Sequence, residues 1–294
     1  AGLADDDVPL RDGGTGARAY AEAVSVYLAF ALSRATNRSS TISVWNTTGE
    51  KIEQVFARQA IPMSWDYPES NPFSDSTGNW LGNMDWIGKA LETVPAQLIQ
   101  GYVQQQDAAQ PTNEASKVVA TDPPYYDNIG YADLSDYFYV WMRPALRLVY
   151  PDIFGTMLVP KEPELIASPY RHGSREAANV HFESGMQRTF ENVRRFVSSE
   201  YPLTVYYAFK QQDSETTDEN NEDGASQVAS TGWETMLTSL IASGFSINGT
   251  WPVRTERSGG VKAQVNALAS SIVLVCRPRP EDAPTISRRQ FVDA

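Results

Sequence analysis

The stretch VVATDPPYYDNIGYADLSDYFYVW, residues 118–141, decides how this chain is expected to fold. It begins with a short apolar run that predicts a β-strand. Pro123 and Pro124 end that strand, because neither can donate a hydrogen bond to a neighbouring strand. From Leu134 onward the apolar residues have helical spacing, and Pro144 predicts a kink in that helix. The sequence therefore predicts a strand, a rigid turn and a helix, in that order.

Outside this stretch, a helix-rich first part precedes a part in which strands and helices alternate. The first part is expected to contain a helix that ends near Asn37, a second from Thr47, where Thr47 and Glu50 match a capping box, and a third near Trp86. The later strands are expected at 97–107, 117–121, 202–210, 245–256 and 270–278. The later helices are expected at 134–150, 174–199 and 231–244.

Strands that alternate with helices are typical of an α/β sheet, and the last two strands should form an antiparallel pair at its C-terminal edge. We therefore expect a Rossmann-like sheet with helices on both faces. The predicted domains are a helical region with a long loop at 1–96, the sheet at 97–280 and a tail at 281–294. Ligands of such sheets bind beyond the carboxyl ends of the strands, so Asp107 and Asp122 should face one crevice.

The composition limits the possible functions. The formal charge is −12, which argues against a simple nucleic-acid binder, although the acidic loop at 213–224 carries much of that charge. No apolar run is long enough to cross a bilayer. Cys276, His172 and His181 lack the spacing of metal ligands. We therefore expect a cytoplasmic protein that binds neither a metal nor a membrane.

The Asp-Pro-Pro-Tyr sequence is suited to hold an aromatic amine, which is a poor nucleophile because its lone pair is delocalised into the ring. The Asp122 carboxylate and the Pro123 carbonyl can accept the two N–H groups, which favours a pyramidal nitrogen. Pro124 stiffens the loop before the substrate arrives. Tyr125 offers a face on which a base can stack, an interaction worth about 1–3 kcal/mol. This chemistry needs neither a metal nor a covalent nucleophile.

The segment TDPPYYDNIGYADLSDYFYVWMR, with GGTGARAYAEAV and WDYPESNPF upstream, resembles the large multi-domain adenine-specific DNA methyltransferases of bacteria and archaea. The resemblance extends to about residue 278. It implies methyl transfer from S-adenosylmethionine to the N6 amine of an adenine flipped out of DNA. It also implies a role in DNA modification and phage defence, with subunits of a defence system as possible partners.

The resemblance assigns roles to individual residues. Asp122, Pro123, Pro124 and Tyr125 match the target-amine motif, and Asp107 matches the acidic position that contacts the adenine of the methyl donor. Ala108 and Thr121 are assigned to the same donor site. The residues expected to bind the DNA substrate are Tyr126, Asp127, Asn128, Tyr131, Arg254, Arg257 and Lys262. No metal ligand is expected.

One feature departs from the family pattern. Such enzymes bind the donor through a turn of the form Asp-Pro-Phe-x-Gly-x-Gly after the first strand, and this chain has no such turn. DGGTGA, residues 12–17, follows no apolar strand. We interpret it as a loop that leads into a helix, with phosphate or donor binding as the alternative. We therefore expect the first strands of the sheet to lie outside this chain, which would be the C-terminal part of a longer enzyme.

Two alternatives remain open. The first is an RNA or cytosine-N4 methyltransferase. Cytosine enzymes more often have Ser where this chain has Asp122, which favours adenine. The second is a non-catalytic DNA-recognition or assembly module that keeps the fold without binding the donor.

Overall fold

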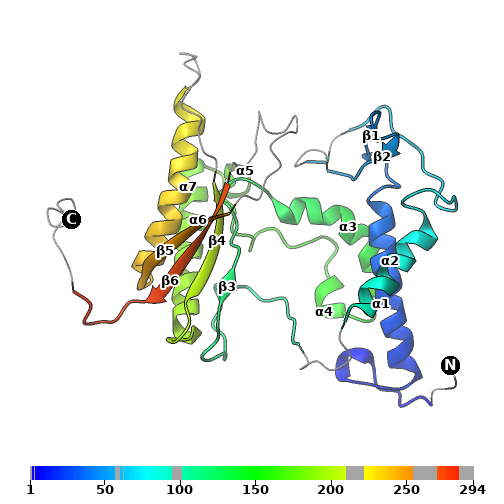
Figure 1. Ribbon diagram of the computed structural model, residues 1–294, viewed down its shortest axis with the longest axis horizontal. Helices are drawn as coiled ribbons and strands as arrows, with labels where there is room; N and C mark the ends of the chain where they lie inside the picture. Colours follow the sequence, from blue (N-terminus) through cyan, green and yellow to red (C-terminus); the bar gives the residue numbers. More distant parts are fainter. Residues whose placement is uncertain are drawn as a thin grey trace. The chain divides into compact units, whose positions relative to one another are not determined.

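The computed structural model describes residues 2, 4–56, 60–61, 63–94, 101–209, 222–253 and 270–284. The chain forms two compact units. One comprises Ala1–Gln105 and Gly130–Glu164, and the other comprises Gln106–Ile129 and Leu165–Ala294. We call them the helical unit and the sheet unit (Figure 1). Residues 130–164 therefore group with the N-terminal region, which differs from the predicted boundary between residues 96 and 97.

The helical unit is built around one long helix, α1 (Ala17–Thr36), which packs against α2 (Trp80–Glu92) and α3 (Tyr131–Leu146). The predicted helices ending near Asn37, near Trp86 and after Leu134 are therefore confirmed, and Pro144 lies inside α3. The shorter elements of this unit are η1 (Leu10–Asp12), β1 (Trp45–Asn46), β2 (Lys51–Ile52) and α4 (Pro151–Phe154).

The predicted helix from Thr47 is wrong, because a small hairpin takes its place. β1 and β2 pair antiparallel across the turn. The Asn46 side-chain oxygen accepts hydrogen bonds from the backbone N–H groups of Thr48 (3.0 Å) and Gly49 (2.8 Å). Such an Asn-centred turn offers the backbone hydrogen bonds that compete with helix formation, so the capping-box pattern at Thr47 does not start a helix.

The aromatic residues of α3 form much of the core of the helical unit. The ring of Phe56 meets Tyr137 and Phe138 edge-on, with centroids 5.6 and 5.9 Å apart. The Tyr137 hydroxyl donates a hydrogen bond of 2.7 Å to the carbonyl of Thr36 at the end of α1. Three of the aromatic residues after the Asp-Pro-Pro-Tyr sequence, Tyr137, Phe138 and Tyr139, therefore serve packing in this unit.

Within its described residues, the sheet unit contains four strands in the order β3-β4-β6-β5. β3 is parallel to β4, whereas β6 is antiparallel to both β4 and β5. The antiparallel pairing of the last two strands is thus confirmed. Of these two strands, β5 lies at an edge of the sheet and β6 lies inside it. The elements of this unit are β3 (Ala120–Thr121), α5 (Pro169–His172), α6 (Arg175–Phe196), β4 (Leu203–Phe209), α7 (Glu222–Ala242), β5 (Phe245–Val253) and β6 (Ser270–Pro278).

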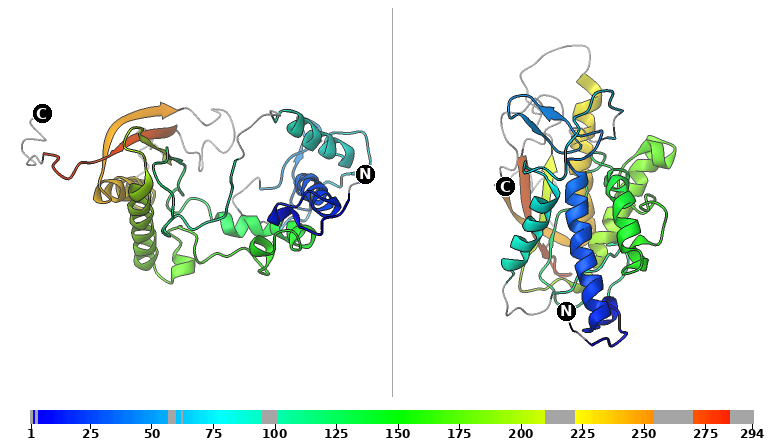
Figure 2. Two further views of the ribbon diagram at one scale, coloured as in Figure 1. Left: turned by 90° about the horizontal axis from the view of Figure 1, so that it is seen from below. Right: turned by 90° about the vertical axis from the view of Figure 1, so that its right-hand side faces the viewer.

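The two long helices of the sheet unit lie on the same face of the sheet (Figure 2). Alternate residues of β4, Leu203, Val205 and Tyr207, are buried on this face against apolar side chains of α6 and α7. On the opposite face Tyr206 is 43% exposed and Trp251 is 68% exposed. In the residues that the structure describes, no helix covers that second face, so the expectation of helices on both faces is not met here.

The segment 101–107, predicted to belong to a strand, forms no strand, while 95–100 lie outside the described residues. Its few apolar side chains, Tyr102 and Val103, are more than four-fifths exposed. With three glutamines in succession, this segment has little apolar surface to bury and so lacks the main driving force for joining a sheet. No helix in the described part of the chain is both long and apolar enough to cross a membrane.

Candidate functional site

The Asp-Pro-Pro-Tyr sequence begins where β3 ends, beside the parallel strand β4. Thr121 is opposite Val205, so Asp122 is the first residue beyond the paired positions. The Asp122 side chain is exposed, and Pro123, Pro124 and Tyr125 are partly buried. The motif therefore follows the carboxyl end of β3 and lies alongside the second half of β4, on the side of a parallel pair at which α/β sheets bind ligands.

The side chains of Asp122 and Tyr125 contact one another. The Tyr125 hydroxyl donates a short hydrogen bond to Oδ1 of Asp122. The Asp122 carboxylate, which is expected to bind an amine, therefore already accepts a hydrogen bond from the Tyr125 hydroxyl. An amine that binds at Asp122 must share this oxygen or displace the tyrosine hydroxyl.

Tyr126 anchors the loop instead of lining an open surface. It is only 6% exposed, and its φ of 57° lies in the left-handed region, which is unusual for an aromatic residue. Its hydroxyl donates a hydrogen bond to Oδ1 of Asn179 on α6, and its carbonyl accepts one of 3.0 Å from the N–H of Ala167. Its ring packs edge-on against Phe182, with centroids 5.2 Å apart. These contacts hold the strained backbone that positions Tyr125. The predicted substrate contact for Tyr126 is not supported by this burial.

Behind the motif lies a buried tyrosine that the sequence analysis did not single out. Tyr207 of β4 is 3% exposed, and the Tyr125 ring meets it edge-on with centroids 5.5 Å apart. Trp233 of α7 also packs against Tyr207, with ring centroids 5.7 Å apart. Burial, together with the nearby charges of Asp127 and Tyr126, raises the pKa of Tyr207 well above its ordinary value. The phenol is therefore neutral at physiological pH.

The other predicted substrate residues of this region differ in their surroundings. Asn128 donates its backbone N–H to the carbonyl of Tyr125 (3.1 Å), which closes the turn. Asp127 is exposed, and its charge adds to the effect of burial in raising the pKa of Tyr126. Tyr131 is 56% exposed at the first position of α3, which belongs to the helical unit. Asp127 and Asn128 therefore belong to the same unit as the motif, whereas Tyr131 belongs to the other unit.

Asp107 and Ala108 do not share a crevice with Asp122 within the sheet unit. The buried side chain of Asn192 donates hydrogen bonds to the carbonyls of Ala108 (3.0 Å) and Gln110 (2.6 Å). Asn192 lies thirteen residues after Asn179 on α6, which is about 20 Å at the helical rise of 1.5 Å per residue. Asn179 contacts the motif loop, so Asn192 holds the Asp107 turn near the opposite end of α6. The expectation of one shared crevice depended on a strand that ends at Asp107, and the described part of that segment, 101–107, forms no strand.

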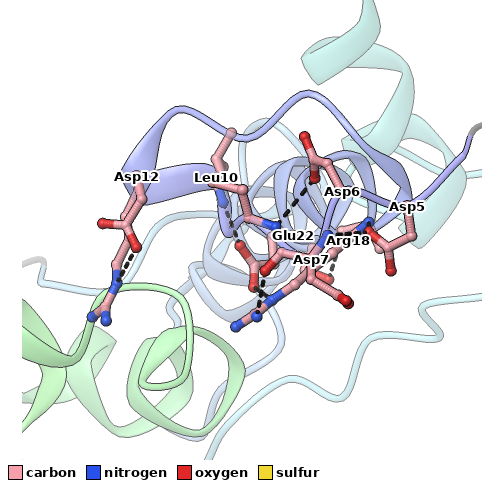
Figure 3. Close-up of polar contacts among 11 residues, drawn as sticks. Asp5, Asp6, Asp7, Leu10, Asp12, Arg18 and Glu22 are labelled. Atoms are coloured by element: carbon pink, nitrogen blue, oxygen red, sulfur yellow. Dashed lines mark hydrogen bonds and ion pairs between the residues drawn. The ribbon is translucent and has the colours of Figure 1, made fainter.

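The glycine-rich segment 12–17 leads into α1, and the carboxylate of Asp6 lies at the N-terminus of this helix (Figure 3). Oδ2 of Asp6 accepts hydrogen bonds from the N–H groups of Thr15 (3.0 Å) and Gly16 (3.1 Å), and these bonds lower the pKa of Asp6. A Cβ at Gly16 would come within 2.5 Å of this carboxylate. The segment is therefore a helix-leading loop, and the amides that an external phosphate would need are already used.

Three predicted residues fall outside the described part of the chain, and a pocket in the helical unit is separate from the predicted site residues. Arg254, Arg257 and Lys262 are outside the described residues. A pocket of about 340 Å³ lies in the helical unit, and its lining, from Pro72 to Asp85, includes none of the predicted site residues. Comparisons of the chain with family models, curated proteins and solved structures give no match. The functional reading therefore depends on the motif and its geometry.

Proposed function

We propose that this chain carries the amine-binding half of an adenine-N6 DNA methyltransferase that uses S-adenosylmethionine. The observation that carries the proposal is the position of Asp122 and Tyr125. A proton acceptor and an aromatic ring lie together in a proline-stiffened loop at the carboxyl end of β3, beside the parallel strand β4. The preceding strand and the antiparallel C-terminal pair add to the sequence resemblance.

On the amine side, each group has a definite task. The Asp122 carboxylate accepts one N–H of the adenine amine, and the carbonyl of Pro123 accepts the other. Both acceptors favour a pyramidal nitrogen whose lone pair is available for reaction. Tyr125 stacks on the base, and the buried anchor at Tyr126 keeps the loop in place before the base arrives. A base inside a duplex cannot reach this loop, so the adenine must be flipped out.

The residues predicted to hold the donor do not form a site with the motif. Asp107 and Ala108 are held at the opposite end of α6, and no glycine-rich donor turn occurs in the sequence. We therefore derive no step that involves the donor, and propose that residues outside this chain bind it. The proposed setting is cytoplasmic DNA modification, with the rest of the enzyme or defence-system subunits as partners.

Mass spectrometry of nucleosides tests this proposal and its alternatives within the class. DNA and RNA would be isolated from cells that contain the enzyme with this chain and from cells that lack its gene. We expect N6-methyladenine in DNA only when the gene is present. N4-methylcytosine in DNA, or a methylated base found only in RNA, would instead support the alternatives.

The placement of Asp107 favours one candidate from another class, a DNA-recognition or assembly module without catalytic activity. Calorimetry with S-adenosylmethionine examines the isolated chain directly. We expect no submillimolar binding, because the donor residues do not come together. Submillimolar binding would show that the chain holds a complete donor site, and would remove the argument for this second candidate.

A further inference from the structure

The contacts beneath Tyr125 indicate how its ring is held. Tyr207 points into the core from β4, on the same face as the fully buried Leu203 and Val205. Its ring presents its face or edge to Tyr125 at an interplanar angle of 87°, with centroids 5.5 Å apart. Edge-to-face contacts of this kind are favourable and depend on orientation, so they restrict the plane that the second ring can adopt.

Tyr207 also contacts α7, the helix that follows β4. Trp233 packs against Tyr207 at an interplanar angle of 38°. Gly232, the residue before Trp233 on α7, lies close to Tyr126 and Tyr207. A Cβ at position 232 would lie 3.2 Å from the Tyr207 hydroxyl oxygen and 3.0 Å from Cβ of Tyr126. A side chain at 232 would therefore require Tyr126 or Tyr207 to shift by a few tenths of an ångström.

We propose that Tyr207 is a positioning residue that sets the orientation of the Tyr125 ring for base stacking, and that Gly232 sets the position of Tyr207. This inference rests on the proposed function of Tyr125. It differs from the role of Tyr126, which anchors the backbone of the loop through Asn179 and Ala167. Tyr207 would act through its ring, because the edge-to-face contact needs no hydroxyl.

Adenosine binding to the 294-residue chain, followed by NMR, tests the proposal. Tyr207→Leu removes the ring and should weaken adenosine binding on the order of tenfold, within the range of one lost stacking contact. Tyr207→Phe keeps the ring and should bind adenosine like the wild type. Tyr206→Leu is the matched control, since it removes the same side chain from the adjacent, 43% exposed position on the other face of the sheet, and should leave adenosine binding unchanged.

A second set of variants covers the case in which Tyr207→Leu fails to fold. Gly232→Ala should displace Tyr207 slightly and weaken adenosine binding, while α7 gains a residue of higher helix propensity. Adding Tyr207→Phe to Gly232→Ala removes the hydroxyl that the new Cβ meets, and should restore part of the lost affinity.

Adenosine binding by the variants and by the wild type separates failure of this inference from failure of the proposed function, and a crystal structure shows the orientation of the Tyr125 ring. If Tyr207→Leu or Gly232→Ala binds adenosine as tightly as the folded wild type, or if the double variant shows no recovery, the inference is overturned. If the wild type binds no adenosine, the proposed base site is contradicted instead. The orientation of Tyr125 in the Gly232→Ala structure then decides. A reoriented ring supports the positioning role of Tyr207, and an unmoved ring overturns it.

Discussion

The hydroxyl of Tyr125 donates a hydrogen bond to the carboxylate of Asp122, so the base-stacking ring and the amine acceptor of the proposed site are joined before any substrate binds. This bond holds the carboxylate at the mouth of the loop. It also means that an incoming amine competes with a hydroxyl from the same four-residue motif. The two functions of Tyr125, stacking and hydrogen bonding, can therefore be separated by substitution.

Tyr125→Phe should retain methyl transfer within a few-fold of the wild type, because the stacking ring remains and Asp122 is released from its partner. Tyr125→Ala should lower kcat/KM by roughly 5- to 150-fold, which corresponds to the 1–3 kcal/mol of one base–aromatic stack. Steady-state kinetics of the enzyme with unmethylated DNA would measure both. Equal losses in the two variants would contradict a stacking role for the ring.

The anchor at Tyr126 should be visible as stability. Tyr126→Phe removes the hydroxyl that bonds to Asn179 and leaves a part-buried amide oxygen without that donor. We expect the free energy of unfolding to fall by about 1–3 kcal/mol, measured by urea denaturation. Tyr131→Phe removes a hydroxyl from a 56% exposed side chain and serves as the control, with little change expected. Similar values for both variants would show that the Asn179 contact contributes little.

The start of α1 should depend on pH through Asp6. Backbone N–H groups lower the pKa of this carboxyl below the ordinary 3.8. Its contribution to stability is therefore fully present above the ordinary pKa and is lost as pH falls through the lowered, folded-state pKa. Asp6→Asn should lower the thermal midpoint at pH 7, and its difference from the wild type should shrink below pH 4. Asp12→Asn, in η1, is the control; a pH-independent difference for Asp6→Asn would contradict the capping role.

Many of the helices and strands could be predicted from the local sequence pattern, whereas the order of the strands in the sheet could not. Helix α6 was predictable because its apolar residues share one face and Ser174 caps its start, with its hydroxyl oxygen accepting the N–H of Ala177 at 3.1 Å. Strands β4, β5 and β6 were predictable from their apolar content. The insertion of β6 between β4 and β5 depends on contacts between distant segments, which no local pattern encodes.

The errors at particular residues have particular causes. The helix expected at 231–244 begins earlier, at Glu222, so its predicted start was wrong. The alternation in β4 indicates that one of Tyr206 and Tyr207 faces the core, but not that the buried one meets Tyr125. The left-handed conformation of Tyr126 could not be foreseen, because it depends on Asn179 and Ala167, some forty to fifty positions later in the chain.

Cys276 should be unreactive in the folded protein. It is fully buried on β6, and burial raises the pKa of its thiol to about 11. Because the thiolate is the reactive form, iodoacetamide should label it negligibly at pH 8 and rapidly after unfolding in urea. The same raised pKa means that its contribution to stability is fully present below the ordinary thiol pKa of 9.0 and is lost as pH rises through 11. Rapid labelling of the folded chain at pH 8 would contradict its burial.

The most direct test of the central claim is the N6-methyladenine content of DNA from cells whose enzyme carries Asp122→Ala in this chain, compared with the wild type. The account predicts that methylation present with the wild type is lost with Asp122→Ala, while the thermal unfolding midpoint stays close to that of the wild type, because the side chain is exposed. Retained adenine methylation with Asp122→Ala would contradict the assignment of this motif as the amine-binding site.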